Sequence, residues 1–96
     1  MSCYFLAQIT IHNATEYQTY LDGFDAVFDK FGGAVVAVDD APALLEGDWP
    51  RARVVLIRFP DEGEARRWYD SPQYQKLAAY RRRAASANIM LIKGRE

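Results

Sequence analysis

Tyrosine and arginine side chains gather in one short stretch of this chain, residues 68–83. Tyr69, Tyr74 and Arg81 are the residues there that are best suited to chemistry. Tyr74 and Arg81 are seven positions apart, so on a helix they share one face, two turns apart. The guanidinium of Arg81 could hold a carboxylate or an enolate with two parallel N–H groups, and a tyrosine hydroxyl could orient a carbonyl or share a proton. This grouping predicts a site for a small anionic or enolisable compound.

The same residues also have a purely structural interpretation. The tyrosine rings could belong to the core, and Arg81 could pair with a carboxylate such as Glu46. The chain would then be a non-catalytic homodimeric interaction module whose interior is filled by side chains. The two interpretations differ in whether an accessible polar pocket lies beside Tyr74.

Three further residues are candidates for ligand binding. Trp49 lies in a turn bounded by glycine and proline, where it could form the wall of a pocket or anchor an interface. His12 follows the first predicted strand and could move a proton near neutral pH. Arg58 shares its strand parity with Val54 and Leu56, so we expect it on a sheet face where a second subunit could supply its partner.

Composition excludes several classes of function. Twelve basic and 13 acidic residues in a chain of 96 give a formal net charge of −1, which would not steer the protein toward nucleic acid or an anionic membrane. An RNA-recognition motif has the same expected order of elements, but residues 53–59 carry aliphatic side chains where stacking rings would be needed. No apolar run is long enough to span a bilayer, and the first residues do not resemble a signal peptide. We therefore expect a cytoplasmic protein that binds neither nucleic acid nor membrane.

The sequence also argues against a metal or a prosthetic group. One histidine and one cysteine are too few for a His/Cys metal site, although carboxylates could bind a hard cation. The lone Cys3 excludes an intramolecular disulfide. No glycine-rich phosphate loop is present. Any reaction is expected to proceed without a cofactor.

The spacing of apolar residues predicts the element order β-α-β-β-α-β. Strands are expected at 3–11, 34–38, 52–59 and 87–93, and 43–46 is a possible continuation of the second strand. Asn13 and Glu16 predict a capping box at the start of the first helix, and Gly32-Gly33 is expected to end it in a left-handed conformation. The second helical region should begin at Asp61 and break at Ser71-Pro72.

This order predicts an α+β, ferredoxin-like domain over residues 1–96. Its sheet would be four-stranded and antiparallel, with the first and third strands central and the helices on one face. The third and fourth strands carry apolar residues on both faces, which exceeds what soluble monomers usually expose. We therefore expect a homodimer formed through the open sheet face, because a twofold interface needs only one self-complementary surface.

A sequence pattern that covers nearly the whole chain supports this architecture. It is strongest in residues 45–49, 54–60, 68–74 and 91–94, together with Arg81. The pattern resembles the domain of unknown function 1330 family, which implies the dimeric α+β barrel of its superfamily and pockets between helices and sheet. Relatives in that superfamily include cofactor-free monooxygenases, haem-binding enzymes and lactone isomerases, so the resemblance implies no single activity. Val38-Asp39-Asp40 departs from the basic, glycine-containing turn that family members often carry, which argues against anion binding by that loop.

Overall fold

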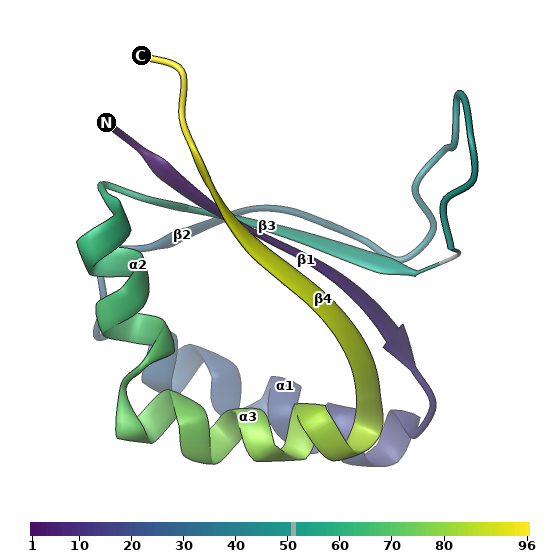
Figure 1. Cartoon of the computed structure of the whole chain (residues 1–96). Helices are drawn as coiled ribbons and strands as arrows, with labels where there is room; N and C mark the ends of the chain where they lie inside the picture. Colours follow the sequence, from purple (N-terminus) through teal and green to yellow (C-terminus); the bar gives the residue numbers. More distant parts are fainter. Residues whose placement is uncertain (51) are drawn as a thin grey trace.

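The computed structural model describes residues 1–50 and 52–96, and within these ranges three helices cover one face of a four-stranded antiparallel sheet (Figure 1). The sheet order is β2-β3-β1-β4, so the first and third strands are central, as predicted. The ferredoxin-like α+β fold is therefore confirmed. The elements in chain order are β1 (Cys3–Ile11), α1 (Ala14–Phe28), β2 (Ala34–Asp39), β3 (Arg53–Phe59), α2 (Glu62–Tyr69), α3 (Pro72–Ala84) and β4 (Ala85–Lys93).

Each helix begins at the capping residue that the sequence predicts. The side chains of Asn13, Asp61 and Ser71 accept hydrogen bonds from the backbone N–H three residues later, at 3.1, 2.7 and 3.1 Å. These bonds satisfy N–H groups that the first helical turn leaves without partners. The second half of the predicted first capping box does not form, because the Glu16 carboxylate accepts a hydrogen bond from Arg83 Nε at 2.6 Å instead.

Some predicted boundaries are wrong. Helix α1 ends at Phe28, with Asp29 as a right-handed C-cap, and not at the two glycines. Of the described glycines, Gly47 alone has a positive φ, at 82°, so Gly32-Gly33 does not serve as a left-handed cap. Residues 43–46 form no strand, and β4 begins at Ala85, two residues earlier than expected.

Gly33 is needed for a close approach of aromatic rings. A Cβ at this position would lie 2.6 Å from Phe59 Cε1 and 2.8 Å from Phe28 Cζ, both buried core atoms. We expect Gly33→Ala to lower the free energy of unfolding by about 1–3 kcal/mol, because the rings would have to move. Gly32→Ala is the matched control, since its Cβ would meet Glu64 Cγ at 3.4 Å, an ordinary contact. Urea denaturation measures both, and equal losses would contradict this account.

The core lies between the helices and one face of the sheet. Alternate residues of β1, β3 and β4 point toward the helices, and Trp68 of α2 packs among them with no exposed surface. Six aromatic rings lie within about 6 Å of the Trp68 ring, including the Phe59 ring, which stacks on it at 5.4 Å between centroids. This cluster joins the helices to the sheet, in agreement with the predicted placement of the helices on one face.

Among the residues that the structure describes, no helix covers the opposite face of the sheet, and the centre of that face is apolar. Leu6 of β1 pairs in register with Leu56 of β3 on one side and Met90 of β4 on the other, and Met90 is 56% exposed. The loop that joins β2 and β3 projects away from the helices, and the two chain ends lie side by side at the far end of β1 and β4 (Figure 1). This open sheet face is the surface that the sequence predicts to meet a second subunit.

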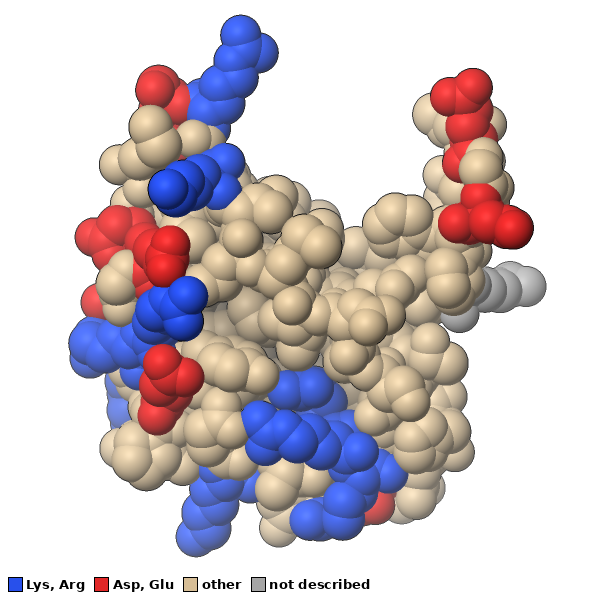
Figure 2. Space-filling model, in the orientation of Figure 1, with Lys and Arg blue, Asp and Glu red and all other residues tan. Residues whose placement is uncertain are grey.

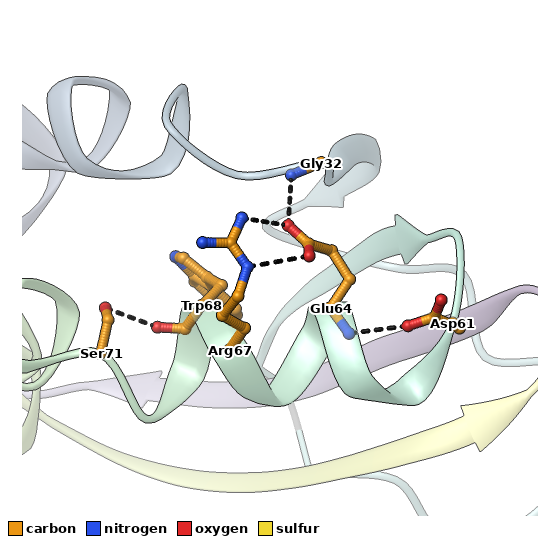
Figure 3. A network of polar contacts seen from close by, with 6 residues as sticks. All are labelled: Gly32, Asp61, Glu64, Arg67, Trp68 and Ser71. Carbon is orange, nitrogen blue, oxygen red and sulfur yellow. Dashed lines mark hydrogen bonds and ion pairs between the residues drawn. The ribbon is translucent and has the colours of Figure 1, made fainter.

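One network of polar contacts ties α2 to the segment that follows α1 (Figure 3). The carboxylate of Glu64 accepts a hydrogen bond from the Gly32 N–H at 2.9 Å and pairs with Arg67 through bonds of 2.9 and 2.7 Å. Ser71, at the break between α2 and α3, donates to the Trp68 carbonyl at 2.8 Å. The Glu64–Arg67 pair on α2 therefore also fixes the position of the backbone at Gly32.

This network predicts a pH dependence. The hydrogen bonds from Arg67 and Gly32 lower the pKa of Glu64 to about 2. Because this pKa is lower in the folded chain than the value of about 4.3 in an unfolded chain, the pairing stabilises the fold above about pH 4.3 and is lost as the pH falls toward about 2. Carboxyl NMR should show the Glu64 titration near pH 2 and its return toward the ordinary range in Arg67→Met. A wild-type Glu64 that titrates above pH 4 would contradict the network.

Candidate functional site

A cavity of about 320 Å³ lies between α1, the end of α3 and the helix-facing side of the sheet. Its volume is at the lower end of the range for small-molecule sites. Asp25, Val35 and Val38 line it and are exposed, so it opens to the surface between α1 and β2. Most of the wall is apolar and aromatic. Its polar groups come from six residues: Arg53, Arg81, Tyr17, Tyr20, Tyr74 and Asp25.

Two tyrosine hydroxyls form the polar centre of this wall. The hydroxyl oxygens of Tyr20 and Tyr74 lie 2.8 Å apart, within hydrogen-bond distance, although the residues are 54 positions apart in the chain. Burial raises the pKa of Tyr20, and burial raises the pKa of Tyr74 more than the nearby Arg81 lowers it. Both hydroxyls are therefore protonated at neutral pH. One donates to the other, and the second proton can serve a ligand.

Arg81 is the unusual residue of the site. It is only 4% exposed, and its Nε and Nη2 atoms have no hydrogen-bond partner among the described residues. These two atoms form one edge of the guanidinium, which can bind a carboxylate with two parallel bonds. A buried charge without a partner is costly, so such a group in a cavity wall indicates a binding role.

The structural interpretation of Arg81 finds no support in the ion pairs of the protein. Within residues 1–50 and 52–96, no carboxylate lies within salt-bridge distance of Arg81, and Glu46 is in the exposed β2–β3 loop. Figure 2 shows basic side chains gathered over the C-terminal half of α3. Arg82 and Arg83 are exposed there and donate hydrogen bonds to Gln75 and Glu16.

Of the three residues proposed for catalysis, two line the cavity. Tyr74 and Arg81 do so from one face of α3, as their spacing predicts. Tyr69 is on α2, and its ring packs against the Tyr74 ring at 5.6 Å between centroids. It lines a separate, more polar hollow beside Glu62 and Arg66, so it lies behind Tyr74 and not in the cavity wall.

The other three candidates lie away from this cavity. Trp49 is in the β2–β3 loop, half exposed, and lines a separate hollow of about 500 Å³ with Pro42, Leu44 and neighbouring residues. Arg58 lies on the open sheet face, where its Nε donates to the Ser2 hydroxyl at 3.1 Å. His12 is exposed, and its backbone N–H donates to the Ala84 carbonyl at 2.9 Å. The placement of Arg58 on the open sheet face agrees with its strand parity.

Sequence reasoning missed four polar residues of the cavity wall, among them Asp25 at its mouth. Tyr17 and Tyr20 appear in the sequence as members of the apolar stripe of α1, and Arg53 appears as the end of a strand. The signal that could have found Arg53 is its strand parity, because it shares the helix-facing side with Val55 and Ile57. Nothing in the spacing of Tyr20 relates it to Tyr74.

No group of three or more His, Cys, Asp or Glu side chains within the described ranges, 1–50 and 52–96, is arranged to hold a metal ion. In the same ranges no helix is both long and apolar enough to cross a membrane.

The sequence matches the family described as domain of unknown function (DUF1330) over residues 2–95. The chain belongs to this family. The resemblance seen in the sequence is therefore confirmed, and the DUF1330 fold is the one described above. No protein of curated function matches the chain.

Several solved structures share this DUF1330 fold. RPA0582, a protein of unknown function from Rhodopseudomonas palustris, has a TM-score of 0.80 and 19% identity over 99% of this chain and 83% of its own. SnoaB, a cofactor-independent oxygenase from Streptomyces nogalater, has a TM-score of 0.71 and 21% identity, and the match covers 99% of this chain and 94% of SnoaB. HapK from Hahella chejuensis has a TM-score of 0.65 and 17% identity, and the match covers 98% of this chain and 92% of HapK. At these identities the likeness extends to the fold alone.

Proposed function

We propose that this DUF1330 protein binds a small anionic or enolisable compound in the cavity beneath the sheet and promotes a cofactor-independent reaction of its anion. The observation that carries the proposal is Arg81, which is buried in the cavity wall with two N–H donors unpaired. The cavity beside Tyr74 also counts against a module whose interior is filled by side chains. The expected cytoplasmic location stays a prediction from the sequence.

The wall favours stabilisation of an anion over abstraction of a proton. Burial raises the pKa of the cavity tyrosines, so none of them is a base at neutral pH. Asp25 is the one carboxylate among the described wall residues, and it is exposed at the mouth. Arg81 would stabilise a developing oxyanion, and the Tyr20–Tyr74 pair would donate to it. Substrates that ionise readily, such as phenols and enols, fit this arrangement. SnoaB, which shares the fold, is a cofactor-independent oxygenase.

Thermal denaturation with benzoate and benzamide tests the binding proposal. The two compounds have nearly the same shape, but only benzoate offers a carboxylate to Arg81. Benzoate at about ten times its Kd should stabilise the fold by roughly 1.4 kcal/mol and raise Tm by roughly 5–10 °C. Benzamide at the same concentration should have little effect. Equal shifts, or none with either compound, would contradict an anion site at Arg81.

We also propose that two copies of the chain pair through the open sheet face. The support is the row formed by Leu6, Leu56 and Met90, which no helix covers. On the side of the molecule that Figure 2 shows, charged side chains gather over α2, the end of α3, the chain ends and the projecting loop, and the surface between them is uncharged. A second sheet would remove this apolar face from water, which is the main driving force of association.

A charge at the centre of that face should separate the copies. Leu56→Asp is expected to convert the protein from a dimer to a monomer at micromolar concentration, because pairing would bury an unpaired carboxylate. Sedimentation velocity measures the change. Gln73→Asp, on the exposed surface of α3, is the control and should leave the dimer intact. A wild-type monomer at this concentration would contradict the proposal.

A further inference from the structure

A second guanidinium lines the same cavity as Arg81. Arg53 is the first residue of β3 and pairs with Ile9 of β1, on the helix-facing side of the sheet. Its Cζ lies 5.9 Å from the centre of the Tyr17 ring, and the Arg81 Cζ lies 6.0 Å from the centre of the Tyr20 ring. The two rings are neighbours, 5.5 Å apart between centroids. The cavity therefore offers two guanidinium positions along one tyrosine-lined wall.

The two arginines differ in how their charge is balanced. Arg53 Nη1 donates to Asp40 Oδ1 at 2.8 Å, whereas Arg81 has no carboxylate partner among the described residues. Arg53 Nε is buried and, within the same residues, has no hydrogen-bond partner. Arg53 thus brings one N–H donor without a partner, and Asp40 already balances the positive charge of its guanidinium. Arg81 brings two free N–H donors and an unbalanced positive charge.

This difference specifies the ligand. A second anionic group at Arg53 would approach the carboxylate of Asp40, and Asp25 at the mouth adds a further negative charge. A neutral oxygen would satisfy Arg53 Nε without that repulsion. The cavity wall also carries apolar side chains from the sheet, among them Phe5, Ile9 and Ile57.

Resting on the proposed anion site, we infer that the ligand is a monoanion with a carbonyl oxygen at its other end. The anionic group binds Arg81, an aromatic or other flat apolar body fills the middle, and the neutral carbonyl accepts a hydrogen bond from Arg53 Nε. Arg53 is then a specificity-determining residue, and Asp40 sets the charge that it accepts. The site selects monoanionic keto acids or keto phenols over dianions.

Calorimetric titration with three benzoates of matched size tests this inference. 4-Acetylbenzoate carries the carbonyl, 4-isopropylbenzoate replaces it with a methyl group, and terephthalate replaces it with a second carboxylate. The wild-type protein should bind 4-acetylbenzoate about tenfold more tightly than either of the others, the size expected for one hydrogen bond to a charged donor.

Two variants assign the preference to its residues. The Arg53→Met variant should bind 4-acetylbenzoate only as tightly as it binds 4-isopropylbenzoate. Its affinity for 4-isopropylbenzoate should differ from that of the wild-type protein by less than about twofold. Asp40→Asn keeps an oxygen for Arg53 but removes the negative charge. The affinity of this variant for terephthalate should therefore rise about tenfold, while its affinity for 4-acetylbenzoate should stay nearly unchanged. Asp40 has a side chain that is 76% exposed, so this variant carries the test even if Arg53→Met does not fold.

The outcomes separate the two proposals. Two outcomes would overturn the roles of Arg53 and Asp40 and leave the anion site at Arg81 standing. One is equal wild-type affinity for 4-acetylbenzoate and 4-isopropylbenzoate. The other is an unchanged preference for 4-acetylbenzoate over terephthalate in Asp40→Asn. Failure of all three compounds and of benzoate to bind would overturn both proposals.

Discussion

Arg81→Met should make the protein more stable and greatly weaken its binding of benzoate. The guanidinium is 4% exposed, and two of its nitrogens are unpaired among the described residues, so the folded state carries an unbalanced buried charge. Methionine has a similar length and needs no hydrogen bonds, so the free energy of unfolding should rise by about 1–3 kcal/mol. The loss of two charged hydrogen bonds should weaken benzoate binding by roughly 100-fold or more.

The adjacent Arg82→Met is the matched control. Arg82 is exposed and bonds to Gln75 at the surface, so its loss should change stability by less than about 0.5 kcal/mol and leave benzoate binding as it is. Urea denaturation and calorimetry measure both variants. If Arg81→Met destabilised the fold and kept its affinity for benzoate, Arg81 would be a structural residue and the proposed function would be wrong.

Trp68→Ala should have the largest effect on folding. Trp68 is fully buried and contacts aromatic rings from β1, α1, β3 and α3, with the Tyr74 ring 4.3 Å away between centroids. Truncation would leave a cavity at the centre of the core and cost about 3–5 kcal/mol. That is a large share of the roughly 5–15 kcal/mol that stabilises a domain. The Tyr20–Tyr74 pair should be lost as well, because Trp68 supports the Tyr74 ring.

The second tryptophan of the chain provides the control. Trp49 is 52% exposed in the β2–β3 loop, so Trp49→Ala should cost less than about 1 kcal/mol. Circular dichroism during urea denaturation measures both substitutions. Similar losses for the two tryptophans would show that the loop, and not the aromatic cluster at Trp68, carries much of the stability.

Local sequence signals predicted most of the fold. The caps at Asn13, Asp61 and Ser71 act within three residues, so their patterns are readable without any tertiary information. The order of the elements predicted which strands are central, and the apolar runs in β3 and β4 predicted an apolar open face of the sheet. The end of α1 was misassigned because Gly33 is required by the rings of Phe28 and Phe59, a contact between elements that no local rule describes.

The candidate site was predictable only in part, for the same reason. Tyr74 and Arg81 share a helix, so their spacing places them together. Tyr20 joins them across 54 positions and Arg53 comes from a separate strand, and both depend on how α1 and β3 pack. Tyr69 precedes the break at Ser71, where the chain changes direction between α2 and α3, and helical spacing does not extend across such a break.

The most direct test of the site is an NMR titration that follows the arginine Nε–H signals as benzoate is added, with Arg81→Met used to assign the Arg81 signal. We expect that signal to move downfield and saturate with the calorimetric Kd, while the signals of Arg82 and Arg83 stay in place. An Arg81 signal that does not respond while benzoate binds, or that shifts equally with the surface arginines, would contradict the central claim that the unpaired edge of Arg81 is the anion site.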